Sequence, residues 1–143
     1  MNITEFLKTG NYLGLQVGSS EENIYSVFSK KDLGKKYYFD KSNKNDGFSY
    51  FCDSLEIMVI DSKIYSLGFD LARCPVTILN KQTIYYSTSL ELIMRYLDVA
   101  DIEWRFEKQY CDNRKLTIKT EGNVLVGCVY EKGNYWLSKF KVY

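Results

Sequence analysis

Apolar residues recur at the three- and four-residue spacing of an amphipathic helix in two segments of the chain. The positions on the apolar side are Ile24, Val27 and Phe28 in the first segment and Leu90, Ile93, Met94 and Leu97 in the second. Each segment is preceded by a capping-box pattern, Ser19 with Glu22 and Thr88 with Glu91. In such a box, the hydroxyl and the carboxylate each accept a hydrogen bond from a free backbone N–H group. We therefore predict a half-buried helix after each pair.

After each helix the apolar period changes to two, which is typical of strands. The predicted hairpins pair Leu55 to Ile60 with Ile64 to Phe69, and Val124 to Tyr130 with Tyr135 to Val142. Further strands are predicted at Lys36 to Phe39 in the first half, and at Ile102 to Phe106 and Leu116 to Ile118 in the second. The apolar pattern of each half therefore predicts a helix followed by an antiparallel meander.

The predicted fold is α+β, with two helix-plus-antiparallel-meander units in one compact domain, residues 1–143. The first unit covers about 1–74 and the second about 75–143, with the single proline, Pro75, in the connection. A chain of 143 residues with 45% hydrophobic and 16% aromatic residues can bury a proper core. The repeated order of elements has two readings, an internal duplication or one domain whose halves share only composition, and both stay open.

Charge does not select a class of partner for the whole chain, since 19 basic and 18 acidic residues give a net charge of +1. Locally, six lysines fall between Lys30 and Lys44, interleaved with Tyr37, Tyr38 and Phe39. Basic and aromatic residues in alternation are typical of surfaces that bind phosphates and stack on bases. Asp32, Asp40 and Asp46 are mixed into the same stretch and dilute its positive field, which argues against nucleic acid as the main partner. The other interpretation of this stretch is a solvated helix end and loop.

Histidine is absent, which excludes Ser-His-Asp and Cys-His catalysis, histidine acid-base chemistry and histidine-containing zinc sites. The nearest carboxylate pairs, Asp53 with Glu56 and Glu103 with Glu107, resemble solvent-facing residues more than a glycosidase pair. We therefore predict no catalytic residue, no cofactor and no metal site, and hence no enzyme.

The four cysteines show no C-x-x-C spacing and are expected to be free, mostly buried thiols of a cytoplasmic protein. The first seven residues lack the basic and apolar regions of a signal peptide, and no stretch is long enough to span a bilayer. We therefore predict a cytoplasmic location without membrane contact.

The segment from Phe6 to Ile24 resembles the opening of small bacterial immunity-type proteins of polymorphic or contact-dependent toxin systems. In that group, a motif of Leu-Gly-Leu, a Gly two residues later, Ser and Glu comes before an apolar helix. A hairpin motif follows it, which corresponds here to Tyr50 to Ile57. The helix from Thr88 to Leu97 is similar to the second half of that group. One departure is Phe28 to Lys31, where the group often has Leu-Gly-x-Pro.

The resemblance implies a cytoplasmic, non-catalytic protein that binds one cognate toxin and occludes its active site. Because interfaces of this kind are often anchored by tyrosine, tryptophan and arginine, two tyrosine pairs and the adjacent lysines are the predicted contacts. These partner-binding candidates are Lys35, Lys36, Tyr37, Tyr38, Tyr85 and Tyr86. The alternative is a nucleic-acid or anionic-ligand binding module that uses Lys30 to Lys44. A homodimer formed through an uncovered sheet edge also stays open.

Overall fold

The computed structural model describes all residues from 1 to 143. The helices are α1 (Thr4–Thr9), α2 (Glu22–Val27), α3 (Lys30–Leu33) and α4 (Leu90–Val99), with the short 3₁₀ helices η1 (Lys44–Asp46) and η2 (Lys108–Tyr110). The strands are β1 (Tyr37–Tyr38), β2 (Phe48–Cys52), β3 (Leu55–Ile60), β4 (Lys63–Asp70), β5 (Val76–Ile78), β6 (Gln82–Ile84), β7 (Trp104–Phe106), β8 (Lys115–Thr120), β9 (Leu125–Glu131) and β10 (Asn134–Val142). The protein is therefore a compact α+β domain.

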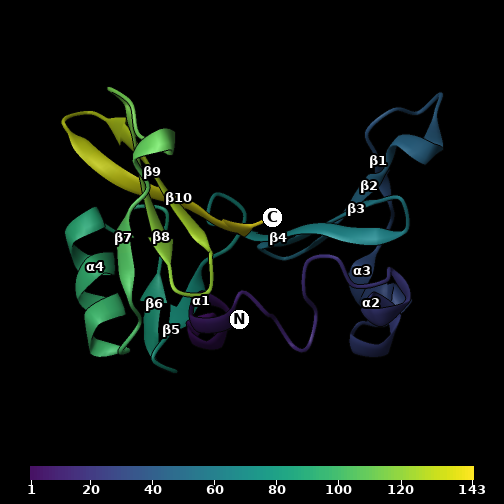
Figure 1. Cartoon of the computed structure of the whole chain (residues 1–143), viewed down its shortest axis with the longest axis horizontal. Helices are drawn as coiled ribbons and strands as arrows, with labels where there is room; N and C mark the ends of the chain where they lie inside the picture. The colour runs from purple at the N-terminus through teal and green to yellow at the C-terminus, as the bar shows by residue number, and fades with distance from the viewer.

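Eight strands form one antiparallel sheet in the order β1-β2-β3-β4-β10-β9-β8-β7, and β5 and β6 form a separate hairpin (Figure 1). The two meanders meet where β4 pairs with β10, from Leu67 with Val142 to Asp70 with Lys139. Both predicted hairpins are confirmed as β3–β4 and β9–β10. The sequence pattern does not predict β2 or the β5–β6 hairpin. The β2 strand lacks apolar-polar alternation, and β5 and β6 are only three residues each.

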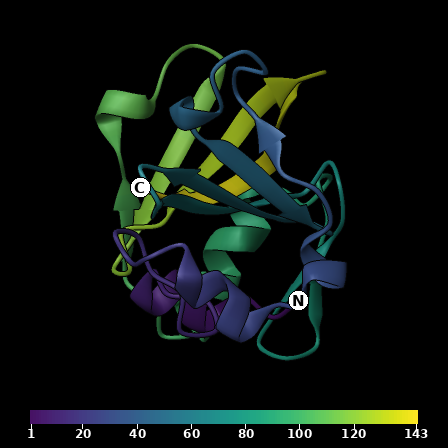
Figure 2. The ribbon, with the colours of Figure 1, turned by 90° about the vertical axis from the view of Figure 1, so that its right-hand side faces the viewer.

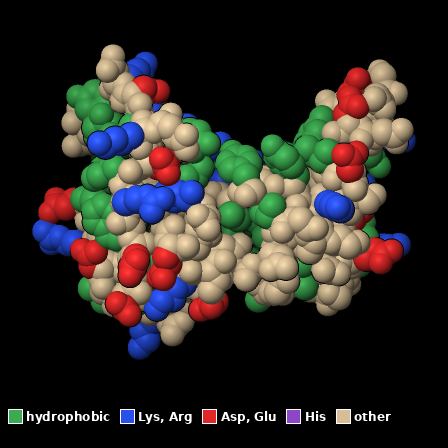
Figure 3. Space-filling model, viewed as in Figure 1, with side chains coloured by type: hydrophobic (Ala, Val, Ile, Leu, Met, Phe, Trp, Pro, Cys, Tyr) green, Lys and Arg blue, Asp and Glu red, His purple; other side chains and the backbone are tan.

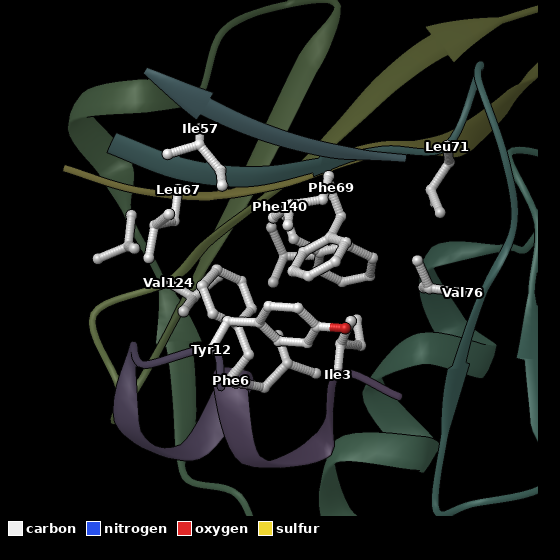
Figure 4. Close-up of a cluster of buried hydrophobic side chains, with 14 of the residues drawn as sticks. Ile3, Phe6, Tyr12, Ile57, Leu67, Phe69, Leu71, Val76, Val124 and Phe140 are labelled. Carbon is white, nitrogen blue, oxygen red and sulfur yellow. The ribbon is translucent and has the colours of Figure 1, made fainter. Parts of the chain in front are cut away.

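The four α-helices and the β5–β6 hairpin lie on one side of the large sheet, so the domain has two layers (Figures 1 and 2). Between the layers, 29 buried apolar residues form a single core cluster that spans both halves of the chain. At its centre, Phe6 of α1 and Tyr12 pack edge-on against Phe69 of β4, with ring centroids 5.1 and 4.9 Å away (Figure 4). A single core explains why the two meanders form one domain. The division near residue 74 stays a prediction.

Each of the two central strands contains a β-bulge. In β4 the extra residue opposite β3 is Tyr65, and in β10 the extra residue opposite β9 is Ser138. A bulge bends its strand and increases the local twist. The ends of the sheet rise as two arms on the side away from the helices, as Figure 1 shows. One arm carries the β1–β2 connection, and the other carries the β9–β10 turn and the β7–β8 connection.

The predicted capping box of Ser19 with Glu22 is wrong. The α2 helix begins at Glu22 without a side-chain cap, and the Ser19 hydroxyl donates to a carbonyl of the preceding turn at 2.6 Å. The reason is that Ser19 ends a turn beside β4, where its carbonyl accepts from the Ile64 N–H at 2.8 Å. A complete capping box lies one helix later, between Ser29 and Asp32 of α3.

Thr88 is also not the cap of α4. The cap is Ser89, whose hydroxyl accepts from the Leu92 N–H at 3.3 Å. The Thr88 hydroxyl accepts from the Tyr85 N–H at 2.9 Å, and its carbonyl accepts from the Leu137 N–H of β10 at 3.2 Å. In both halves, the residue expected to start the helix pairs with the last strand of its meander. The helix starts only after this pairing ends.

Candidate partner-binding face

One face of the large sheet has no α-helix packed on it, only the short η2 at the end of β8, and we call it the open face. Strand alternation defines it: in β3 the side chains of Leu55, Ile57 and Val59 are buried in the core, and their neighbours point to the other side. Residues with this outward direction are Tyr37, Ser49, Phe51, Glu56, Met58, Ile60, Tyr65, Ser66, Gly68, Asp70, Arg105, Lys115, Thr117, Lys119, Leu125, Gly127, Val129, Trp136, Lys139 and Lys141. Figure 3 shows this face as a hollow between the two arms, with hydrophobic side chains on its floor.

Exposed aromatic rings lie on the open face in two edge-on pairs. Tyr37 packs against Phe51 with ring centroids 5.2 Å apart, and Tyr65 packs against Tyr143 at 6.2 Å. The exposed fractions are 46% for Tyr37, 49% for Tyr65 and 60% for Tyr143. Large tyrosine surfaces of this kind, held in place by a neighbouring ring, are suited to anchor a protein partner.

A groove of about 420 Å³ lies in the open face of the C-terminal half, and we call it the lysine groove. It is lined by Tyr65, Tyr110, Lys115, Thr117, Leu125, Gly127, Lys139, Lys141 and Tyr143. Gly127 of β9 lies between Thr117 of β8 and Lys139 of β10. Because it has no side chain, it forms the floor of the groove. A second hollow of about 430 Å³ shares Tyr110 and Tyr143 with the groove and adds Lys119. The two hollows are therefore neighbours, and together we call them the depression.

The depression is positively charged. Its linings contain four lysines and no aspartate or glutamate. Only Lys141 has a carboxylate partner, since its Nζ lies 3.7 Å from Glu56 Oε2, on the neighbouring part of the open face. Lys115, Lys119 and Lys139 form no ion pair with any residue of the chain. Two lysines without an ion pair, Lys115 and Lys139, thus line the groove, and a third, Lys119, lines the neighbouring hollow.

Lys36, one of the predicted contacts, is used inside the fold. Its Nζ bonds Glu21 Oε1 at 2.7 Å and lies 4.0 Å from the ring centroid of Phe48. Burial alone raises the pKa of Glu21, but the hydrogen bonds from Lys36 and Tyr25 outweigh it and lower that pKa overall. Burial likewise tends to lower the pKa of Lys36, and the Glu21 carboxylate raises it overall. The pair therefore fixes β1 against α2, and little of Lys36 is left for a partner.

The remaining predicted contacts of the first stretch differ from one another in exposure. Lys35 is exposed with its Nζ 5.0 Å from the Tyr37 ring centroid, and Tyr37 belongs to the open face. Tyr38 points to the core side, where its ring packs edge-on against Phe48 at 5.7 Å. Of the predicted candidates, Tyr37 is thus the one that the structure places on the open face.

Tyr85 and Tyr86 lie in the turn between β6 and α4, outside the large sheet. Tyr85 is 54% exposed, whereas Tyr86 is half-buried against the core. The following residues pair with β10, which is separated from β1 by three strands. At a spacing of about 4.8 Å between strands, the two predicted tyrosine pairs are about 19 Å or more apart. The structure therefore does not bring them together into one site.

The two carboxylate pairs of the sequence do not come together in one pocket. Glu103 lines one hollow with Asp98 and Asp101 and a second with Arg105, Lys119 and Glu121, whereas Glu107 lines neither of these two hollows. Asp53 is exposed in the β2–β3 turn, and Glu56 accepts from the Ser49 hydroxyl at 2.9 Å in addition to its contact with Lys141. Glu103 is exposed before β7. No group of three or more Cys, Asp or Glu side chains in residues 1–143 is arranged to hold a metal ion. No helix is both long and apolar enough to cross a membrane.

All four cysteines are free thiols. Cys128 of β9 is fully buried, and burial raises the pKa of its thiol to about 12. Cys52 is only half-buried, and burial together with the Asp53 carboxylate raises the pKa of its thiol as well. Cys74 and Cys111 are also half-buried, so burial is complete at one thiol only.

The residues of the lysine groove are absent from the predicted contacts, although the sequence contains a signal for them. Lysines alternate with other residues in Lys115-x-Thr117-x-Lys119 and in Lys139-x-Lys141-x-Tyr143, which places each set on one face of its strand. What alternation alone does not give is the order of strands, which brings β8, β9 and β10 side by side.

Comparisons of this chain with protein-family models, with curated proteins and with solved structures found no match. The resemblance to immunity-type proteins therefore stays a prediction from the sequence.

Proposed function

We propose that this protein is a non-catalytic binding protein of the immunity type, which neutralises a cognate bacterial toxin domain by covering its active site. The observation that carries the proposal is the concave open face, which has no α-helix on it and holds exposed tyrosines between two arms (Figure 3). Eight strands at a spacing of about 4.8 Å make this face about 34 Å wide. That width suits a standard interface of about 800 Å² on each partner.

The proposed mechanism is occlusion by a preformed surface. The open face is backed by the single core cluster and by continuous strand pairing from β1 to β7, so its shape is fixed before binding. A preformed surface loses little conformational entropy when it binds, which favours affinity. The toxin would be inactivated as long as it is covered, without turnover and without a covalent step.

The experiment is to clone the adjacent upstream reading frame, test it for toxicity, and co-express it with this protein. We expect growth rescue and co-purification at a one-to-one ratio. In the double variant Tyr65→Ala/Tyr143→Ala both should be lost, because these rings are exposed at the centre of the open face. The matched control is Val99→Ala, since Val99 is 73% exposed on α4 and lies outside the sheet.

Two results would contradict the proposal. The first is a toxic neighbour that neither binds nor is silenced by the wild-type protein. The second is rescue that survives the double tyrosine variant but fails in the control, which would move the interface to the helical side.

We also infer that the two meanders derive from one duplicated unit. Three features support this: the order helix-then-four-strands, a bulge in the last strand of each unit, and pairing of the residue before each helix with that strand. In an experimental structure, superposition of the meanders should place Ile64 on Leu137 and Leu67 on Phe140. An offset of one residue would place core positions on open-face positions and would contradict the inference.

A further inference from the structure

The lysine groove differs from the rest of the open face in charge and in shape. Its positive charges gather around one hollow, and Lys115 and Lys139 stand exposed at its rim. Volumes of about 420 and 430 Å³ for the two neighbouring hollows lie in the range of sites that enclose small groups or short peptide segments. The positive charge and the size of the groove therefore suit a compact anionic group.

The groove also supplies the hydrogen-bond donors that a carboxylate needs. Lysine ammonium groups and tyrosine hydroxyls both donate, and donors to an ionised carboxylate form stronger bonds than neutral pairs do. Tyr65, Tyr110 and Tyr143 contribute three hydroxyl-bearing side chains to the lining. The lining has no aspartate or glutamate of its own, and the Glu56 carboxylate that pairs with Lys141 lies outside it.

The surroundings of the groove favour an acidic protein segment over a nucleic acid. Towards the N-terminal half, the open face continues with Glu56, Met58 and Phe51, which are acidic or apolar. A polyanion that left the groove in this direction would first meet the Glu56 carboxylate. The next cations, Arg73 beside Phe51 of β2 and Lys35 beside Tyr37 of β1, lie further away. The whole chain, with a net charge of +1, gives no long-range attraction for a polyanion either. A protein with one acidic protrusion and an apolar surround matches both regions.

We propose that the lysine groove receives a protruding, carboxylate-bearing segment of the partner protein. This inference rests on the proposed function, because it names the chemistry of the partner at the same open face. The aspartate or glutamate side chains of that segment lie above Gly127 and are bound by the lysines of β8 and β10.

Gly127 provides the sharpest test. A Cβ atom at this position would lie 3.7 Å from the Lys139 carbonyl oxygen, an ordinary contact, so the backbone leaves room for a side chain to begin there. Gly127→Val should therefore keep the fold and fill the floor of the groove. The double variant Lys115→Gln/Lys139→Gln removes the rim charges and keeps the shape. Lys81→Gln is the control, because Lys81 is an exposed lysine in the β5–β6 turn, away from the sheet.

The binding probe is a fluorescein-labelled octapeptide with four glutamates, measured by anisotropy at low salt, with thermal unfolding as the check of the fold. We expect binding to the wild type, at least tenfold weaker binding to Gly127→Val and to the double lysine variant, and no change in Lys81→Gln. A single-stranded oligonucleotide of equal charge should bind more weakly than the peptide.

Each other outcome overturns the inference. Absence of peptide binding, equal binding by the groove variants, or preference for the oligonucleotide removes the acidic segment as the occupant. The peptide test needs no toxin, so its failure is separate from failure of the proposed function. Conversely, growth rescue that survives Gly127→Val would leave the immunity role in place and reject the groove as its contact.

Discussion

The two halves of the large sheet share the order of their elements but differ in the chemistry of their open faces. On β2 and β3 the outward residues include Phe51 and Met58, whereas on β8 and β10 they include Lys115, Lys119 and Lys139. On the core side both halves carry the same kind of apolar residue. The difference shows that the core-facing positions of each strand stabilise the shared fold. The alternate positions, on the open face, determine what each half can bind.

The largest expected effect concerns the core that joins the halves. Phe69→Ala should lower the free energy of unfolding by about 3–5 kcal/mol, because it removes the ring contacts of Phe69 with Phe6 and Tyr12 and leaves a cavity in the core. Both halves should still unfold in one transition, since they share one core cluster. Trp104 and Trp136 both lie in the C-terminal half, so their fluorescence and far-UV circular dichroism should give coincident denaturation curves. A fluorescence midpoint that stays at the wild-type value would show separate halves.

The second comparison sets two open-face glycines against each other. A Cβ atom on Gly68 of β4 would lie 2.8 Å from the Phe140 carbonyl oxygen, which is too close, so Gly68→Ala should cost about 1–3 kcal/mol. Gly127→Ala in β9 has room and should change stability by at most about 0.5 kcal/mol. Chemical denaturation measures both. Equal losses of stability in the two variants would mean that the groove floor at Gly127 is as closely packed as the pairing of β4 with β10 at Gly68.

The third comparison concerns ion pairs. Lys36→Met should cost about 1–2 kcal/mol at neutral pH, because it leaves the partly buried Glu21 without its cation. In the other half, Arg95→Met should cost at most about 0.5 kcal/mol, since the Arg95–Glu91 pair is 72% and 71% exposed.

The effect of Lys36 should depend on pH. Because the folded pKa of Glu21 lies below its ordinary value of 4.5, the contribution is present above pH 4.5 and is lost as the pH falls through the folded pKa. The wild type and Lys36→Met should therefore converge in stability below pH 4.5. Denaturation curves at pH 7 and pH 3 measure this, with Arg95→Met as the control. A difference that stays constant over this range would contradict the role of the pair.

The smallest expected effect compares the serines at the two bulges. Ser66 is fully buried and its hydroxyl has no hydrogen-bond partner, so Ser66→Ala should raise the free energy of unfolding by about 0.5–1 kcal/mol. Ser138 is only half-buried, and Ser138→Ala should stay within about 0.5 kcal/mol of the wild type. A loss of stability in Ser66→Ala would indicate that this hydroxyl makes a bond.

Local periodicity was sufficient to predict the hairpins and α4. Leu55, Ile57 and Val59 alternate in sequence and all point into the core, as predicted. The caps were not predictable from the same local pattern. Ser19 and Thr88 look like ideal N-caps, but each is held beside a strand about 45 to 50 residues further along the chain, at Ile64 and Leu137. Long-range pairing overrides a local preference worth only about 1 kcal/mol.

The candidate site was less predictable than the fold. Alternation indicates that the lysines of β8 share a face, and likewise those of β10, but it does not indicate that the two strands flank β9. It also does not indicate which face is left without helices. For Lys36 the sequence indicates a contact that the structure uses differently. Its neighbours in sequence are basic and aromatic, but its ammonium group forms an ion pair with Glu21, 15 residues earlier.

The seam between β4 and β10 also has a consequence for the order of events during folding. Leu67 pairs with Val142, which is 75 residues away, whereas β3–β4 and β9–β10 are each joined by a tight turn. Local hairpins form in microseconds, while closure of a long loop carries an entropic cost and comes later. Until the seam closes, the edges of β4 and β10 remain unpaired, and either can accept the matching strand of another copy. High concentration during folding should therefore favour strand-exchanged dimers, and dilution should favour the monomer.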